Sequence, residues 1–216
     1  MTDADTTPVP SEPTIRPYRE GDLQQVYDVC VRTADAGGDA RGMYDTDQVM
    51  GDIFAAPYVV LEPETAFVLE DAGQVVGYIV GTADTAAFVA AYRERWMPQV
   101  ADRYPPTDRV AVTPTELLLV LHHNPERMLE TDLVNYPAHL HIDLLPDYQR
   151  RGLGKLLMAR LLEALRAAGA PAVHLGVLSS NTSARAFYAR MGFVELDLVD
   201  PSGMGTFLGR STSGGV

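Results

Sequence analysis

A short run of basic residues and glycines, Gln149 to Leu157 (QRRGLGKLL), has the residue types needed to bind a pyrophosphate group. A helix that begins in this run would offer backbone N–H groups without helical partners, together with the positive end of its dipole. Gly152 and Gly154 would let phosphate oxygens approach the backbone. Positive charge would come from three neighbours, Arg150, Arg151 and Lys155. A plain turn between a strand and a helix would explain the same glycines.

The flanking residues predict that this run joins a strand to a helix. The preceding segment, Ala138 to Pro146 (AHLHIDLLP), is apolar at alternate positions and ends at a proline. The following segment is apolar at helical spacing, at Leu153, Leu156, Leu157, Leu161, Ala164 and Leu165. The order of elements is therefore strand, glycine turn, helix.

The strand before the turn carries candidate acid–base groups. Alternation places His139, His141 and Asp143 on one face, opposite Ile142 and its apolar neighbours. Burying three unpaired titratable groups in a row is costly, so we expect this face to look into a cleft. A neutral histidine, or a carboxylate with a pKa raised by burial, could accept a proton from an ammonium group. Hydrogen bonds to neighbouring strands would explain the same side chains.

A second candidate group lies in the segment Ser179 to Leu196 (SSNTSARAFYARMGFVEL), which follows another apolar run. Asn181 and Tyr188 are seven residues apart, about two helical turns, so they project from one face of a helix. A phenol with an ordinary pKa of about 10 suits proton donation to a thiolate of similar basicity. The alternatives are a helix N-cap for Asn181 and a core aromatic for Tyr188.

These two blocks resemble the two signatures of the GNAT superfamily of N-acetyltransferases, over Ala138 to Phe193. The first signature, Q/R-x-x-G-x-G/A, is matched by Gln149, Gly152 and Gly154. The second is matched, in the right order, by Asn181, Phe187-Tyr188 and Gly192-Phe193.

The resemblance implies a role for each matched residue. Acetyl-CoA would be the co-substrate, with its pyrophosphate held by the glycine turn, Gln149, Arg150, Arg151, Gly152, Leu153, Gly154 and Lys155. The backbone of Ile142 and Leu144 would bind the pantetheine arm and the thioester, and Asn181 would bind the pantetheine arm. Tyr188 would protonate the departing thiolate. Asp143 is our first candidate for the general base, because it lies nearest the thioester end of the strand, and His141 is the second.

Three further segments resemble the acetyltransferase-like C-terminal domain of animal O-GlcNAcases. They are TIRPYREGDLQQVYDVC, FVLEDAGQVVGYIVGTAD and RERWMPQVADRY. That domain lacks a good version of the glycine turn, so the likeness supports the fold and the inserted helices and carries over no function. It also motivates an alternative to an enzyme, namely a non-catalytic acyl-CoA-binding module or regulatory domain.

Composition narrows the partners. The 216 residues carry a formal net charge of −12, which disfavours nucleic acid and anionic lipid and favours a cationic acceptor if charge selects it. The single cysteine, Cys30, allows no internal disulfide and agrees with a reducing compartment. The N-terminus has no signal-peptide pattern, and no apolar run is long enough to span a membrane, so we expect a cytoplasmic protein. The histidines lack metal-ligand spacing, so we expect no metal.

The resemblance implies an α/β acetyltransferase fold, a mixed, centrally splayed sheet of about seven strands with helices on both faces. A single domain would span residues 14–210, between a disordered tail at 1–13 and a flexible tail at 211–216. The early elements would be a strand at Thr14 to Arg19, a helix to Thr33, a short helix at Thr46 to Ala55, and a hairpin turning at Ala72-Gly73. The helical segment 86–135 would be an insertion that borders the substrate cleft, or else a structural flap or homodimer contact.

Overall fold

The computed structural model describes residues 12–198, 200 and 203–215, so most of the tail predicted at 1–13 lies outside the described residues. The strands are β1 (Thr14–Pro17), β2 (Ala66–Asp71), β3 (Gln74–Thr82), β4 (Ala138–Leu144), β5 (Ala172–Leu178), β6 (Val194–Glu195) and β7 (Gly205–Ser211). The α-helices are α1 (Leu23–Val31), α2 (Gln48–Phe54), α3 (Ala56–Leu61), α4 (Thr85–Ala91), α5 (Met97–Val100), α6 (Pro114–His123), α7 (Leu153–Ala167) and α8 (Thr182–Arg190).

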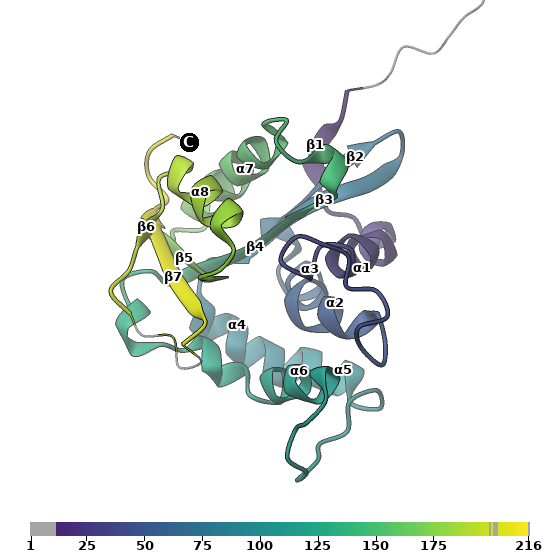
Figure 1. Cartoon of the computed structure of the whole chain (residues 1–216). Helices are drawn as coiled ribbons and strands as arrows, with labels where there is room; N and C mark the ends of the chain where they lie inside the picture. The colour runs from purple at the N-terminus through teal and green to yellow at the C-terminus, as the bar shows by residue number, and fades with distance from the viewer. Residues whose placement is uncertain (1–11, 199, 201–202, 216) are drawn as a thin grey trace, which may run out of the picture.

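The strands form one seven-stranded mixed sheet in the order β1-β2-β3-β4-β5-β7-β6, which confirms the predicted fold class (Figure 1). The parallel pair in the centre, β4 and β5, is joined over only two residue pairs, Ala138 with Val173 and His139 with His174. Beyond His139 the described pairing stops, whereas β4 stays paired with β3 as far as Leu144. The sheet is therefore splayed at its centre, as the sequence predicts.

Helices cover both faces of the sheet. The long helix α7 packs against β2, β3 and β4, with Leu161 lying 3.3 Å from the Cβ position of Gly81 on β3. Alternation along β4 places Leu140, the partner of Gly81, on this same face. Helices α1 and α3 pack on the other face, which carries His139, His141 and Asp143. The acid–base candidates on β4 therefore lie on the face away from α7.

The N-terminal half follows the prediction except at one helix. The β2–β3 hairpin turns at Ala72 and Gly73, which both have positive φ (48° and 79°), as a two-residue type I′ hairpin turn requires. No helix is expected between Ala55 and the hairpin, because Pro57 is typical of a connecting segment. Pro57 instead occupies the first turn of α3, where its missing N–H needs no partner. This helix carries Tyr58, whose role is described below.

The predicted insertion is helical and includes, besides α4, α5 and α6, a π-helical turn η3 (Tyr92–Trp96) and the 3-10 turns η4 (Pro125–Met128) and η5 (Thr131–Leu133). It is tied to α2 through Asp52, a fully buried carboxylate. Tyr104 donates to Oδ2 of Asp52 at 2.6 Å, and the indole N–H of Trp96 donates to the Asp52 carbonyl at 2.8 Å. The hydroxyl of Tyr27 on α1 donates to Oδ1 of the same carboxylate. Helix α2 therefore links the insertion to the core.

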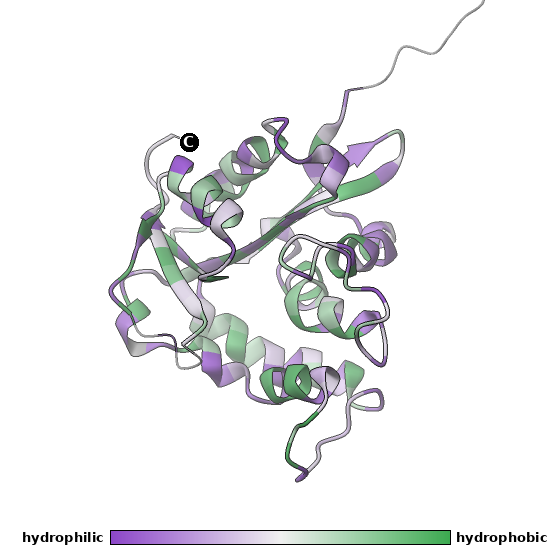
Figure 2. Cartoon of the chain, in the orientation of Figure 1, coloured by the Kyte–Doolittle hydropathy of each residue, from purple (hydrophilic) through white to green (hydrophobic). Residues whose placement is uncertain are grey.

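Helix α6 exposes apolar side chains on the surface of the insertion. Figure 2 shows α6 as a strongly hydrophobic helix, and its Leu117 and Val120 are more than half exposed. Among the described residues, no helix is long and apolar enough to cross a membrane.

At the other end of the chain, β7 runs through Ser211, and the Thr212 hydroxyl donates to the Ala170 carbonyl at 2.6 Å. The domain limits proposed from the sequence remain a prediction.

Candidate active site

The glycine turn is a left-handed loop that opens α7. Gly152 is the N-cap residue of this helix, with φ +81°, and Arg150 also has positive φ (57°). The side chain of Gln149 donates to the Leu144 carbonyl at 2.9 Å, which ties the turn to the end of β4. The turn therefore places the N-terminus of α7 next to the strand that the sequence predicts to bind the pantetheine arm.

The cations of the turn are available to an anionic ligand. Arg150, Arg151 and Lys155 are exposed, and none of them forms an ion pair with a residue that the structure describes. The Arg151 guanidinium lies over the Tyr148 ring, and its Cζ is 5.3 Å from the ring centroid. Free N–H groups at a helix N-terminus, together with unpaired cations, fit the pyrophosphate of a coenzyme.

The two glycines of the turn differ in what surrounds them. A Cβ on Gly152 would meet no atom within 4 Å, so this position is open. A Cβ on Gly154 would lie 3.2 Å from Cε2 of Phe187 and 3.8 Å from Cδ1 of Leu144. The sequence led us to expect phosphate beside both glycines, but the space beside Gly154 holds the Phe187 ring. Gly154 thus allows α8 to pack against α7.

One backbone edge of β4 faces the gap between β4 and β5. The Leu145 N–H donates to the Val76 carbonyl at 3.0 Å, so Leu145 points its backbone groups toward β3. Antiparallel pairing alternates this direction, so Ile142 and Leu144 point theirs away from β3. Because β5 pairs only with Ala138 and His139, the N–H and C=O of Ile142 have no strand partner on that side. Such an edge can hydrogen-bond the amides of an extended ligand.

Tyr188 projects from α8 with its hydroxyl free. Its ring packs against those of Phe187 and Phe193, with centroids 5.3 and 5.5 Å away. Its hydroxyl bonds to none of the described residues. Among those residues, the one buried side-chain nitrogen or oxygen without a hydrogen-bond partner is Nε2 of His123, so the Tyr188 hydroxyl keeps some exposed surface although the residue is buried. Burial, and then the charge of Asp143, raise the pKa of Tyr188 above the ordinary value expected from the sequence, so the phenol stays protonated at neutral pH.

Asn181 is the N-cap of α8. Its side-chain oxygen accepts the Ala184 N–H at 3.0 Å, the structural role that the sequence also allows. Its side-chain amide N–H groups bond to no described residue. The capping bond therefore fixes the side chain and leaves these donors for a ligand.

The three titratable groups of β4 differ in accessibility. His139 is buried and bonded at both ring nitrogens, so it lies in the core rather than in the expected cleft. Asp143 is half-buried, and its Oδ2 accepts the hydroxyl of Tyr78 from the neighbouring strand at 2.6 Å. Burial raises the pKa of Asp143, partly opposed by this hydrogen bond.

His141 is half-buried and has one free nitrogen. Its Nε2 lies 3.2 Å from the Tyr58 hydroxyl, and its Nδ1 bonds to no described residue. Since Nδ1 is not among the buried unpartnered atoms, part of its surface is exposed to solvent. Burial, and then the charges of Arg127 and His174, lower the pKa of His141 to about 4, so the ring is neutral at pH 7. A neutral ring with an accessible nitrogen can accept a proton.

Sequence reasoning missed the residues that surround these groups, Tyr58, Tyr78, Thr85 and Arg127. Each contacts or faces β4 from an element distant in the chain, and no spacing relates them to the strand. The described residues contain no cluster of three or more metal-ligating side chains.

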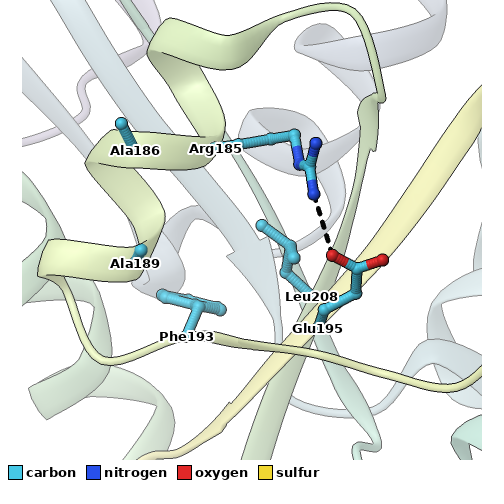
Figure 3. A pocket seen from close by; sticks show the side chains of 6 residues that line it. All are labelled: Arg185, Ala186, Ala189, Phe193, Glu195 and Leu208. Carbon is cyan, nitrogen blue, oxygen red and sulfur yellow. Dashed lines mark hydrogen bonds and ion pairs between the residues drawn. The ribbon is translucent and has the colours of Figure 1, made fainter.

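A surface pocket lies elsewhere, between α8 and the β6–β7 pair. It has a volume of about 290 Å³, and two of its lining residues, Arg185 and Glu195, form an ion pair at 2.8 Å (Figure 3). The other lining residues are Ala186, Ala189, Phe193 and Leu208. It contains none of the predicted site residues and is not part of the candidate active site.

Comparison with known proteins supports the assignment of this region. The profile of the Acetyltransferase (GNAT) family matches residues 119–193, which include β4, the glycine turn, α7, β5 and α8. The crystal structure of a protein called SsHAT is 55% identical, with a TM-score of 0.90, and the match covers 94% of this chain and 100% of that chain.

Two curated relatives match more narrowly. The protein O-GlcNAcase of Rattus norvegicus is 29% identical over 192 residues, which cover 88% of this chain and 21% of the relative. The chain thus spans about a fifth of the length of that protein. The [ribosomal protein bS18]-alanine N-acetyltransferase of Salmonella typhimurium is 44% identical over 50 residues, which cover 23% of this chain and 34% of the relative.

Proposed function

The chain belongs to the GNAT family of acetyltransferases, and on that premise we propose that it transfers the acetyl group of acetyl-CoA to a primary amine. One series of contacts carries this proposal. The end of β4 at Leu144 is bonded to Gln149 of the glycine turn and lies beside Gly154. Gly154 packs against Phe187, the neighbour of Tyr188. The three parts that we propose would bind the pyrophosphate, align the thioester and protonate the thiolate are adjacent.

Each part has a chemical role. The N-terminus of α7 with Arg150 and Lys155 would hold the pyrophosphate, and the free edge of β4 at Ile142 would align the thioester. The acceptor ammonium loses a proton to a base on β4, and the amine nitrogen then bonds to the acetyl carbon. The carbon–sulfur bond breaks, and the departing thiolate takes the hydroxyl proton of Tyr188. The second proton that the nitrogen loses as it becomes an amide returns through solvent to the Tyr188 oxygen.

Two groups are candidates for the base. Asp143 is closer to the thioester end of β4, and its raised pKa makes the carboxylate more basic than usual. His141 has an open Nδ1 that no described residue occupies.

The acceptor itself is a primary amine, and the net charge of −12 favours a cationic molecule. We also propose that the protein acts in the cytoplasm, where its buried thiol at Cys30 would stay reduced.

The alternative is an acyl-CoA-binding or regulatory module without turnover. Two observations favour it: the likeness to part of an O-GlcNAcase, and the low basicity of His141. Both functions predict binding of acetyl-CoA, which calorimetry would measure. They differ in the release of free CoA thiol with a panel of peptides, polyamines, aminoglycosides and amino acids. Amine-dependent release supports the enzyme, whereas tight binding without release from any amine supports the module.

A further inference from the structure

Four side chains form a continuous line of hydrogen bonds that leads to the face of β4. Thr85 of α4 lies 2.7 Å from Nδ1 of His139, and Nε2 of His139 lies 2.7 Å from the hydroxyl of Tyr58. The same hydroxyl lies 3.2 Å from Nε2 of His141. Thr85 also lies 2.7 Å from the Pro137 carbonyl oxygen.

The hydrogen bonds of Thr85, at one end of this line, determine which atom donates and which accepts in every other bond. Two oxygens 2.7 Å apart require a hydrogen between them, and a carbonyl has none, so the single Thr85 hydroxyl proton points to Pro137. The Thr85 oxygen must then accept a hydrogen bond from His139, so the ring proton of His139 is on Nδ1. Nε2 of a neutral His139 is therefore an acceptor and takes the hydroxyl proton of Tyr58. The Tyr58 oxygen in turn accepts from Nε2 of His141.

The neutral state of His139 is secured by its surroundings. Its side chain is buried, and its pKa is lowered well below the ordinary value by burial and by His174, His141 and Arg127. The line of bonds therefore has one direction at neutral pH.

We infer that Tyr58 is a positioning residue for His141. Its hydroxyl holds the proton of His141 on Nε2 and leaves Nδ1, the open nitrogen, as the proton acceptor. This inference rests on the proposed function and selects His141 as the base. When Nδ1 takes a proton from the acceptor ammonium, His141 becomes an imidazolium whose Nε2–H is already bonded to the Tyr58 oxygen. The amine is left with the electron pair that attacks the thioester.

The groups that face His141 from other elements support this arrangement. The Phe54 ring of α2 meets the His141 ring edge-on, with ring centroids 5.6 Å apart. The Arg127 guanidinium lies over the Phe54 ring, 5.9 Å from its centroid. Arg127 forms no ion pair with a described residue, so its charge acts on His141 unneutralised. On the strand itself the neighbour is His139, 6.3 Å away between centroids. These groups keep the ring neutral until it accepts the substrate proton.

The direct test is the tautomer of His141, read from the imidazole nitrogen shifts of isotope-labelled full-length protein and assigned by the signal lost in His141→Gln. We expect the Nε2–H form in the wild type. Tyr58→Phe keeps the ring that stacks on Phe88, with centroids 4.4 Å apart, and removes only the hydroxyl. The variant should show a mixture of tautomers and a turnover lowered about tenfold with unchanged acetyl-CoA affinity.

Tyr92→Phe is the matched control, because the buried Tyr92 hydroxyl bonds to His122 at 2.8 Å and not to β4. It should lose similar stability yet keep the His141 tautomer and the turnover. An Nδ1–H form of His141 in the wild type overturns the inference. So does unchanged turnover of Tyr58→Phe in a protein that releases CoA. Absence of CoA release from the wild type with every amine overturns the proposed function instead, and the tautomer measurement needs no turnover.

Discussion

The ring of Phe187 lies 3.2 Å from the Cβ position of Gly154, so the second glycine of the turn is a contact between two helices. Gly152, two residues earlier, has open space beside it. Glycine is therefore required at these two positions of one signature for different physical reasons. One admits the helix that carries Tyr188, and the other adopts a left-handed backbone at the start of α7.

We predict that Gly152→Val weakens acetyl-CoA binding and that the fold survives. A side chain there would project into the space next to the helix N-terminus, and the positive φ would cost roughly 1–2 kcal/mol of stability. Gly169→Val is the control, because Gly169 has φ +89° and open space at the far end of α7. Calorimetry and thermal melting should show equal destabilisation of both variants but lost affinity only for Gly152→Val. Equal affinities would mean that the turn is structural only.

Gly154→Val should behave differently, because this position is not open. Its side chain would collide with Phe187 and displace α8, an overpacking that typically costs about 1–3 kcal/mol. Any loss of affinity in this variant should therefore come with a lower melting temperature. A fully stable Gly154→Val protein would refute the packing role of this glycine.

Replacement of the two candidate bases should separate them. His141→Gln removes the open nitrogen and should lower turnover about 100-fold at neutral pH, with recovery as the pH approaches the pKa of the acceptor amine. Asp143→Asn should cost less, because Oδ2 already accepts the Tyr78 hydroxyl. Initial rates of CoA release across pH provide the measurement. A larger loss in Asp143→Asn would make Asp143 the base and remove His141 from the mechanism.

Stability should fall as the pH drops from about 6.5 to about 4. Burial, as the largest cause, lowers the pKa of His141 and of His122 to about 4, whereas unfolded histidines take up protons near pH 6.5. The unfolded state binds more protons in this window, so each histidine removes on the order of 3 kcal/mol of unfolding free energy across it. Asp143 acts in the opposite sense, because its raised pKa lets the folded state take up that proton first. Urea unfolding at a series of pH values tests this, and a flat or rising stability toward pH 4 would contradict it.

The insertion should loosen when its anchor is removed. Asp52→Ala leaves the hydroxyls of Tyr27 and Tyr104 without their acceptor, and loss of such a buried network typically costs about 3 kcal/mol or more. Hydrogen exchange should rise most in residues 92–104. Asp39→Ala, which removes an exposed ion pair with Arg41, should change neither quantity. Wild-type protection of residues 92–104 in Asp52→Ala would show that other contacts hold the insertion.

The fold was predictable because its signals are local. Apolar spacing indicated α7 and β4, a turn dipeptide indicated the β2–β3 hairpin, and two motifs in order indicated the splayed sheet. Helix α3 could not be predicted from the sequence, because Pro57 is compatible both with a connecting segment and with the first turn of a helix.

The surroundings of the site were not predictable, since they depend on tertiary contacts. Alternation placed His139, His141 and Asp143 on one face, but only the structure shows that α3 and α4 cover one end of it. It therefore distinguishes a core histidine, His139, from one with an open nitrogen, His141. The space beside Gly154 likewise depends on Phe187, which lies on another helix.

The most direct test of acetyl transfer is a matched measurement on Tyr188→Phe. The hydroxyl bonds to no described residue and is not fully buried, so its removal should leave the melting temperature and the acetyl-CoA affinity unchanged. Loss of the proton donor to the thiolate should lower amine-dependent CoA release about 100-fold. A Tyr188→Phe protein that melts, binds acetyl-CoA and releases CoA as the wild type does would contradict the mechanism.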